Sequence, residues 1–474
     1  MPSATIATAT LTEADVLAAP RLITPLPGPR AKAIMERDDK VISPSYTRGY
    51  PLVMARGQGA VVQDVDGNTF IDACAGIAVC ATGHHHPRVT AAIQQQASQF
   101  LHMSGTDFYY DGLPTLAERL QATMPVYTDS NGNQCQNYKV FFGNSGAEAN
   151  EGAIKLARYH TGRQNVVSFY RSFHGRTYGA MSLTASKSVH KKRVGPLLSG
   201  VFHAQYPFHY QEPLGATEAD TAQACLEWFE SHIFGREFPA DELAAIVVEP
   251  IQGEGGYIVP HDSWLLGLQA ICRKHGALLV VDDVQAGMGR TGKIWATNHV
   301  AGLEPDILTS AKGLASGLPL GAIIAKADVM NWVPGVHATT FGGNPVACAA
   351  AIATLDCLEG QDGEPNLCDH ATVMGERLMA GLRAMQQRIP HIGDVRGRGL
   401  MVGVELVLNP TTKEKAKALR DAVVDAAFYH GLMILGCGEN SIRFSPPLVI
   451  TEAQIDKTLA IFEQTLIEQI AQHG

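Results

Sequence analysis

The stretch Asp306-Ile-Leu-Thr-Ser-Ala-Lys-Gly-Leu-Ala-Ser-Gly-Leu-Pro-Leu-Gly321 places one lysine in apolar, glycine-rich surroundings. From residue 307 to residue 325, Lys312 is the only charged side chain. Ile307 and Leu308 predict a short strand ahead of it. Loss of water lowers the pKa of an amine, and a neutral amine is a nucleophile toward carbonyl groups. The alternative is a lysine at a strand end whose charged head reaches solvent.

The composition bounds the class of protein. A chain of 474 residues is too long to fold around one simple hydrophobic core, so we expect two domains. The net charge of −9 argues against a nucleic-acid or anionic-membrane partner. The sequence contains no run of 18 apolar residues, so we expect no transmembrane helix. The nine cysteines form no Cys-x-x-Cys pair, which fits a reducing compartment, and we expect a cytoplasmic protein without a metal site.

Short apolar strands alternate with helices in the middle of the chain. We expect strands at 139–142, 165–169, 244–248, 277–281, 307–308 and 321–324. Such alternation predicts βαβ units and an α/β fold with a mostly parallel sheet flanked by helices. A hairpin is expected at 60–72, and a smaller α+β region follows, with strands at 400–406 and 441–444 and helices at 414–429 and from 452. We divide the chain into a large domain at 86–345 and a small domain built from 1–85 and 346–474.

The segment Phe141-Phe-Gly-Asn-Ser-Gly-Ala-Glu-Ala-Asn-Glu-Gly-Ala-Ile-Lys-Leu-Ala-Arg158 predicts a strand, a turn and a helix. Ser145 and Glu148 have the spacing of a capping box, and Gly143 and Gly146 let a ligand approach the backbone. Free N–H groups at a helix start bind anions. Plain helix capping is the alternative interpretation.

Two further strands end in acids. Ala277-Leu-Leu-Val-Val-Asp-Asp-Val-Gln285 carries Asp282 and Asp283 at its end, where ligands bind in open α/β sheets. Ala244-Ala-Ile-Val-Val-Glu-Pro-Ile-Gln-Gly-Glu254 carries Glu249 and Glu254. The run Gly287-Met-Gly-Arg-Thr-Gly292 spells a dinucleotide-binding pattern, but five residues separate it from the strand, so we disfavour that interpretation.

Two motifs have open interpretations. Phe173-His-Gly-Arg-Thr177 offers an aromatic face and a guanidinium, although a core aromatic and a surface charge would look the same. The run His84-His85-His86 suggests a metal site, but consecutive histidines do not converge on one ion without distortion of the backbone.

Five motifs occur in one order: the helix start at Ser145, Phe-His-Gly-Arg-Thr, Val-Glu-Pro-Ile-Gln-Gly-Glu, Asp-Asp-Val-Gln and Ala-Lys-Gly. Together they resemble the class III, fold-type I pyridoxal-phosphate aminotransferases, of the 4-aminobutyrate and ornithine aminotransferase kind. The resemblance covers roughly residue 40 to the end. Thr340-Phe-Gly-Gly-Asn-Pro and Ser441-Ile-Arg-Phe-Ser-Pro-Pro-Leu are further family marks. The family usually has Asp-Glu-Val-Gln, and here the second acid is Asp283.

The resemblance implies pyridoxal 5'-phosphate as cofactor and a role for each motif. Lys312 would bind the cofactor covalently and move the substrate proton. Asp282 would keep the pyridinium nitrogen protonated, so that the ring withdraws electrons. Gln285 would hydrogen-bond the phenolic oxygen, and Phe173 and Val284 would cover the two ring faces. The remaining cofactor-site residues are Ser145, Gly146 and Ala147 at the phosphate, with His174, Glu249 and Thr340.

The resemblance also implies substrates and a partner. Arg443 would bind the α-carboxylate of glutamate or 2-oxoglutarate, and Glu254 would cover Arg443 when an ω-amino donor is bound. Arg176 would take the distal carboxylate, and Ile77 would line the substrate channel. Because Thr340 reaches the phosphate of the neighbouring subunit in the family, we expect a homodimer with shared active sites, or a dimer of dimers.

Four functions stay open on the sequence. The first is transfer of an amino group from an ω-amino acid to 2-oxoglutarate. Racemases and epimerases share this fold and cofactor, and they differ only in where the substrate proton returns. A dinucleotide dehydrogenase is disfavoured by the misplaced glycines. A non-catalytic pyridoxal-phosphate module is disfavoured because Lys312 is present and no basic helix-turn-helix precedes the domain.

Overall fold

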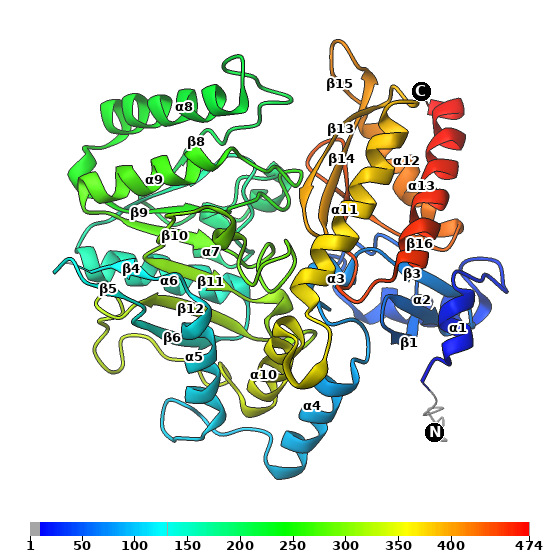
Figure 1. Cartoon of the computed structure of the whole chain (residues 1–474), viewed down its shortest axis with the longest axis horizontal. Helices are drawn as coiled ribbons and strands as arrows, with labels where there is room; N and C mark the ends of the chain where they lie inside the picture. Colours follow the sequence, from blue (N-terminus) through cyan, green and yellow to red (C-terminus); the bar gives the residue numbers. More distant parts are fainter. Residues whose placement is uncertain (1–9, 130, 474) are drawn as a thin grey trace.

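The computed structural model describes residues 10–129 and 131–473, which fold into two bodies side by side (Figure 1). The middle of the chain builds the body on the left, around the larger sheet. Both ends of the chain build the body on the right. There, Lys457 of α13 (Glu452–His473) donates a hydrogen bond of 2.8 Å to the carbonyl oxygen of Leu17 in α1 (Glu13–Ala18). The two ends of the chain are therefore in contact within the second body.

The large sheet has seven strands in the order β6-β12-β11-β10-β9-β7-β8. Its strands are β6 (Tyr138–Gly143), β7 (Asn165–Phe169), β8 (Val201–Ala204), β9 (Leu243–Val248), β10 (Leu278–Asp282), β11 (Ile307–Ser310) and β12 (Gly321–Lys326). Only β12 runs antiparallel to its neighbours. The six predicted strands and the mostly parallel sheet are confirmed. Strand β8 was not predicted, because it is short and carries His203 in its centre.

Helices cover both faces of this sheet, which is why its strands are apolar throughout. Along β9, Ile246 and Val248 pack under α9 (Asp262–His275), whereas Val247 belongs to the core under α6 (Gly146–Thr161). The other helices of this body are α4 (Pro87–Gln99), α5 (Gly112–Thr123), α7 (Tyr178–Leu183), α8 (Glu218–Trp228) and α10 (Pro345–Glu359).

The second body contains two smaller sheets. The N-terminal strands β1 (Met54–Gln58), β2 (Val61–Asp64) and β3 (Thr69–Asp72) form one sheet with the C-terminal strand β16 (Leu432–Met433). The other contains β13 (Ile392–Arg398), β14 (Met401–Asn409), β15 (Glu414–Lys415), β17 (Leu435–Cys437) and β18 (Ser441–Phe444). The hairpin and the strand at 441–444 match the prediction. A small two-stranded sheet, β4 (Tyr127–Thr128) with β5 (Gln134–Cys135), belongs to the first body.

The helices of the second body are α1, α2 (Pro29–Val41), α11 (Leu367–Gln386), α12 (Lys417–Tyr429) and α13. Helix α13 starts at 452, as predicted. Helix α12 starts three residues later than predicted, because Glu414 and Lys415 pair with β14 as an edge strand instead. The turn α3 (Ala75–Ala78) is unusual, since all four of its residues have positive φ.

The glycine-rich run at 287–292 packs between the two bodies. A side chain at Gly289 would meet Leu448 of the second body at 2.9 Å, and one at Gly292 would meet Thr372 of α11 at 2.3 Å. Between them, the buried Arg290 donates hydrogen bonds to the carbonyl oxygens of Leu400 (3.1 Å) and Pro446 (2.5 Å). These glycines therefore allow close packing of the two bodies.

The boundaries at residues 85 and 345 stay a prediction. Helix α10, which begins at the second boundary, packs on α4 and α5 of the first body. Within residues 10–129 and 131–473, no helix is long and apolar enough to cross a membrane.

The contact between α11 and the loop at Gly399 gives a test of the fold. A Cβ atom at Gly375 would lie 2.0 Å from the carbonyl oxygen of Gly399. Gly375→Ala should therefore lower the free energy of unfolding by about 1–3 kcal/mol, as overpacking does. Gly235→Ala is the matched control, since its Cβ would meet no atom within 4 Å. Urea unfolding of both variants measures this, and equal stabilities would contradict the packing.

Candidate active site

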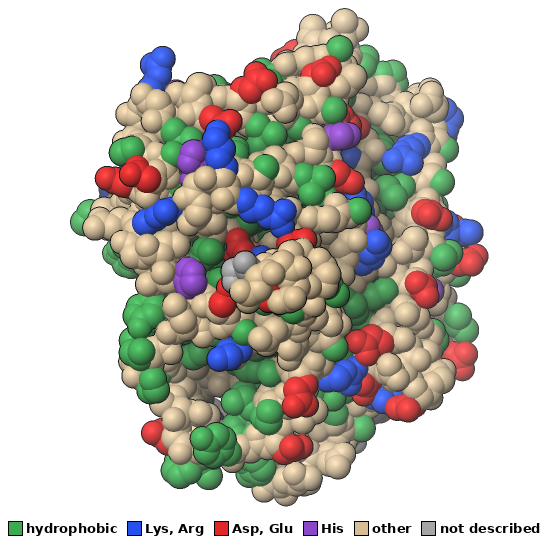
Figure 2. All heavy atoms as spheres, turned by 60° about the vertical axis from the view of Figure 1, so that its left-hand side comes forward, with side chains coloured by type: hydrophobic (Ala, Val, Ile, Leu, Met, Phe, Trp, Pro, Cys, Tyr) green, Lys and Arg blue, Asp and Glu red, His purple; other side chains and the backbone are tan. Residues whose placement is uncertain are grey.

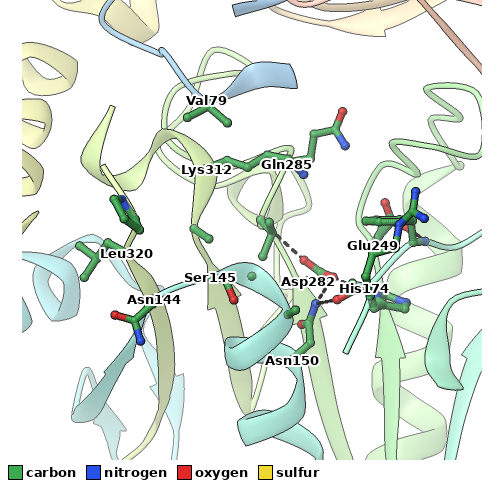
Figure 3. A pocket seen from close by; sticks show the side chains of 18 of the residues that line it. Val79, Asn144, Ser145, Asn150, His174, Glu249, Asp282, Gln285, Lys312 and Leu320 are labelled. Carbon is green, nitrogen blue, oxygen red and sulfur yellow. Dashed lines mark hydrogen bonds and ion pairs between the residues drawn. The ribbon is translucent and has the colours of Figure 1, made fainter. Parts of the chain in front are cut away.

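A cavity of about 530 Å³ opens at the carboxyl ends of the parallel strands (Figure 3). In an α/β sheet this is the edge at which ligands bind. Eleven of the predicted site residues line it: Ser145, Gly146, Ala147, Phe173, His174, Arg176, Glu249, Asp282, Val284, Gln285 and Lys312. They come from the loops after five different strands, so the fold brings together what the sequence separates.

Lys312 lies two residues beyond the end of β11, after Ala311. Its backbone has a φ of +37°, a left-handed conformation that a non-glycine residue rarely adopts. The next turn is fixed by Ser316, whose Oγ lies 2.7 Å from the Oγ1 of Thr82 and accepts a hydrogen bond from the Thr82 N–H. Burial lowers the pKa of Lys312, although Asp282 and Glu254 pull it upward. Burial thus favours the neutral form of this amine, which lines the cavity.

Asp282 is buried at the end of β10, where its Oδ1 accepts a hydrogen bond of 3.1 Å from the N–H of Val284 and two side chains hold its Oδ2. Its Oδ2 lies 2.6 Å from Nδ1 of His174 and accepts a hydrogen bond of 2.7 Å from Nδ2 of Asn150 (Figure 3). Burial disfavours a protonated His174, but the hydrogen bond and charge of Asp282 outweigh this, so the pKa of His174 is raised. The arrangement stabilises a carboxylate that faces the cavity.

Asp283 points the other way. Its Oδ2 accepts hydrogen bonds from the N–H (3.3 Å) and Oγ1 (3.1 Å) of Thr297, and the side chain is fully buried. Burial raises the pKa of Asp283 to about 7. Of the two adjacent acids, only Asp282 lines the cavity.

The start of α6 forms one end of the cavity. Ser145 is its N-cap, and its Oγ accepts a hydrogen bond of 3.2 Å from the N–H of Glu148. A side chain at Gly146 would meet Cγ1 of Val284 at 2.7 Å, so the helix start and the loop after β10 touch only because residue 146 is glycine. The free N–H groups of this turn provide an anion site.

Glu249 fixes the backbone at Phe173. Its two carboxylate oxygens accept hydrogen bonds from the N–H groups of Phe173 (2.9 Å) and Gly253 (2.8 Å). Burial raises its pKa to about 7. The Arg176 guanidinium lies 5.6 Å from the centre of the Phe173 ring. Farther along, Gln285 Oε1 accepts a hydrogen bond of 3.0 Å from the hydroxyl of the buried Tyr257.

Glu254 and Arg443 lie just beyond the cavity lining. Oε1 of Glu254 and Nη1 of Arg443 are 2.5 Å apart, and their side chains are 17% and 6% exposed. Burial opposes the charge of Glu254, but Arg443 and Lys187 outweigh it and lower its pKa. The pair joins the loop after β9 to β18 of the second body. The two charges act on Lys312 in opposite directions, since Glu254 raises the pKa of the amine and Arg443 lowers it.

The other two predicted residues lie apart from the lining. Ile77, on the left-handed turn α3, is 43% exposed. Thr340 is exposed on the segment between β12 and α10. The three histidines of 84–86 diverge: His84 pairs with Asp72 at 2.8 Å, and His86 lies 3.7 Å from the sulfur of Cys357. Among the described residues, no cluster of three or more metal-binding side chains occurs.

The sequence interpretation missed Asn150, Asn144, Val79 and the loop 317–320 in the lining. Asn150 carried a readable signal. Positions 150, 153, 154 and 157 share one face of α6, and Asn150 is the only polar one among them. A polar residue on a buried helix face needs a hydrogen-bond partner, and Asp282 supplies it.

Residues 42–466 match the sequence profile of the class-III aminotransferases. The chain belongs to that family. It is 39% identical to a 4-aminobutyrate aminotransferase of Mycobacterium tuberculosis, over 93% of this chain and 96% of the relative. It is 38% identical to an isoleucine 2-epimerase of Lentilactobacillus buchneri, over 92% and 94% of the two chains. An (S)-enantioselective omega-transaminase structure from Thermomicrobium roseum superposes with a TM-score of 0.82 at 30% identity, covering 93% of this chain and 98% of that one.

The cofactor of this class-III aminotransferase is pyridoxal 5'-phosphate. The cavity has the features that this molecule needs. The anion site at Ser145 suits a phosphate, the buried Asp282 suits a protonated ring nitrogen, and the Phe173 and Val284 side chains suit the ring faces. Lys312 supplies the amine for the aldehyde carbon.

The buried Asp283 predicts a pH dependence of stability. An unfolded aspartate has a pKa of about 3.9, whereas burial raises that of Asp283 to about 7. Between these values the folded state retains a proton that the unfolded state has lost, so wild-type stability falls as the pH rises from about 4 to about 7. Asparagine does not titrate, so Asp283→Asn does not lose stability in this way. The stability of Asp283→Asn relative to wild type should therefore rise over this range by on the order of 1–4 kcal/mol.

Urea unfolding of both proteins at several pH values measures this difference. Glu249 also titrates near pH 7, but it is common to both proteins and cancels. Parallel stability profiles for the two proteins would contradict a protonated Asp283.

Proposed function

We propose that this enzyme transfers the amino group of an ω-amino acid, such as 4-aminobutyrate, to 2-oxoglutarate. The observation that carries the proposal is the ion pair of Glu254 and Arg443 beside Lys312. Arg443 suits the α-carboxylate of the oxo acid. An ω-amino donor has no α-carboxylate, and a buried arginine without a partner is costly. Glu254 supplies that partner during the half of the reaction in which the donor is bound.

The residues around the cavity then take these roles. Lys312 would accept the proton from the donor carbon, while Asp282, fixed by His174 and Asn150, would hold the ring nitrogen protonated. When bound, the cofactor would supply an electron sink for the pair left on the donor carbon. The start of α6 would hold the phosphate, and Gln285 would hold the phenolic oxygen. Burial of the amine among apolar side chains excludes competing water.

The substrate contacts follow the same proposal. Arg176, stacked beside Phe173, binds the distal carboxylate. Ile77, exposed on its left-handed turn, lines the channel. A second candidate function is racemisation or epimerisation of an amino acid, which the 38% identity to an isoleucine 2-epimerase favours.

We further propose a cytoplasmic homodimer in which Thr340 reaches the phosphate site of the other subunit. Exposed apolar side chains support this. Phe108 and Phe341 are 55% and 62% exposed, and Thr106 donates a hydrogen bond to the carbonyl oxygen of Thr339. Figure 2 shows acidic and basic side chains interspersed over one face, with hydrophobic ones gathered toward its lower part. Burial of such a patch would drive dimer formation.

Lys312→Ala should abolish turnover, with a loss of well over a hundredfold, because no other amine lies in the cavity lining. The variant should still retain pyridoxal phosphate without a covalent bond, since Asp282 and the anion site persist. Gel filtration followed by cofactor release in alkali measures retention. Lys274→Ala, at an exposed lysine, is the control. A Lys312→Ala enzyme that keeps a hundredth of wild-type activity would refute the assignment.

Glu254→Ala should shift the donor preference. Removing one partner of a buried ion pair typically costs about 3–5 kcal/mol, so use of 4-aminobutyrate should weaken relative to glutamate by tens-fold or more. Half-reaction kinetics with each donor measure kcat/KM. Equal changes for both donors would contradict the role of Glu254 as the partner that covers Arg443. They would favour the racemase, in which every substrate has an α-carboxylate. Monitoring loss of optical rotation in the same samples tests that second function directly.

A further inference from the structure

Glu254 faces two cations. Its Oε1 lies 2.5 Å from Nη1 of Arg443, and its Oε2 lies 3.9 Å from Nζ of Lys187. Arg443 belongs to β18 of the second body. Lys187 belongs to the first body, in the loop between α7 and the short turn Ser188–Lys191. The carboxylate thus sits between a near partner and a more distant one.

Substrate binding creates a problem for this carboxylate. When an α-carboxylate takes Arg443, Glu254 loses its near partner. Its side chain is only 17% exposed, and burial already opposes its charge. A buried charge without a partner is strongly unfavourable, and this would weaken the binding of every α-carboxylate substrate. The acid therefore needs a second cation within reach.

We propose that Lys187 is the positioning residue that receives the Glu254 carboxylate whenever a substrate α-carboxylate occupies Arg443. This inference rests on the proposed function. An ion-paired N–H···O bond is about 2.8 Å long, so the gap of 3.9 Å needs to close by only about 1 Å. Lys187 is 42% exposed, and Glu254 is its only ion-pair partner in the described part of the chain, so its flexible stem is available.

The geometry favours a movement of side chains alone. The carbonyl oxygen of Glu254 accepts a hydrogen bond of 2.7 Å from the N–H of Gly438, which fixes its backbone. The flanking glycines are tightly packed: a side chain at Gly253 would meet Gln285 at 2.3 Å, and one at Gly255 would meet Gln252 at 2.6 Å. We therefore expect rotation of the Glu254 side chain from Arg443 to Lys187.

Other cations near Glu254 are committed elsewhere. Lys312 also lowers the pKa of Glu254, but it is the amine that binds the cofactor. Arg176 lies over the Phe173 ring at the cavity wall. Loss of Lys187 would leave the proposed amino transfer intact. It would remove only the second ion-pair partner of the Glu254 carboxylate.

The test measures binding of glutarate, a dicarboxylate that cannot react, to the holoenzyme by titration calorimetry. Lys187→Met keeps the apolar stem and should raise the Kd of glutarate roughly three- to tenfold, as expected for a partly exposed charged contact. Lys187→Arg should restore binding. Lys192→Met removes one positive charge from an exposed position just after the turn Ser188–Lys191 and is the matched control for a general electrostatic effect.

Kinetics then locate the effect. In Lys187→Met, KM for 2-oxoglutarate should rise by the same factor with little change in kcat, and KM for 4-aminobutyrate should change less. In a Glu254→Ala background the same substitution should have no effect on glutarate binding, because the acid that needs Lys187 is gone.

Three results would overturn the inference. The first is an equal loss of binding in Lys192→Met. The second is an effect of Lys187→Met that persists without Glu254. The third is an unchanged glutarate Kd in Lys187→Met, provided that the wild-type enzyme forms glutamate from 2-oxoglutarate. If the wild-type enzyme forms no glutamate with any ω-amino donor, the proposed function fails as well, and the two failures are thereby distinguished.

Discussion

A carboxylate buried at the end of β10 constrains the whole centre of this enzyme. Asp282 is buried there, and His174 and Asn150 both contact its Oδ2. His174 comes from the loop after β7 and Asn150 from the first turns of α6, so three segments must meet at one atom. Asn150 in turn accepts a hydrogen bond of 2.7 Å from Thr309 of β11, the strand that leads to Lys312. One polar network thus fixes the spacing between the acid and the amine.

The second body contributes a cation close to the site. Arg443 of β18 lies beyond the cavity lining and pairs there with Glu254 of the first body. The contact is supported by Arg290, whose buried guanidinium bonds to two carbonyl oxygens of the second body. Any motion of the two bodies relative to one another therefore changes the position of Arg443 with respect to Lys312.

Much of this could be predicted from the sequence, because it depends on local pattern. Apolar runs predicted six strands of the large sheet, and an acid or a lysine directly after a strand predicted Asp282, Glu249 and Lys312. Long-range partners could not be predicted in this way. Neither the bond between Asn150 and Asp282 nor the proximity of Lys187 to Glu254 has a signature in spacing. The late start of α12 depends on pairing of 414–415 with β14, a tertiary effect that outweighs helix propensity.

The pairing of β3 with β16 has a consequence for synthesis of the chain. Leu432 lies opposite Ile71 in a parallel ladder, so the N-terminal hairpin finds its neighbour only after nearly all of the chain has left the ribosome. Until then, the edge of β3 and its apolar residues Phe70 and Ile71 lack the cover that they have in the native state. Contacts this distant in sequence form slowly. The nascent chain is therefore expected to depend on chaperones during elongation, and loss of residues 432–474, which include β16, would leave the edge of β3 without its neighbouring strand.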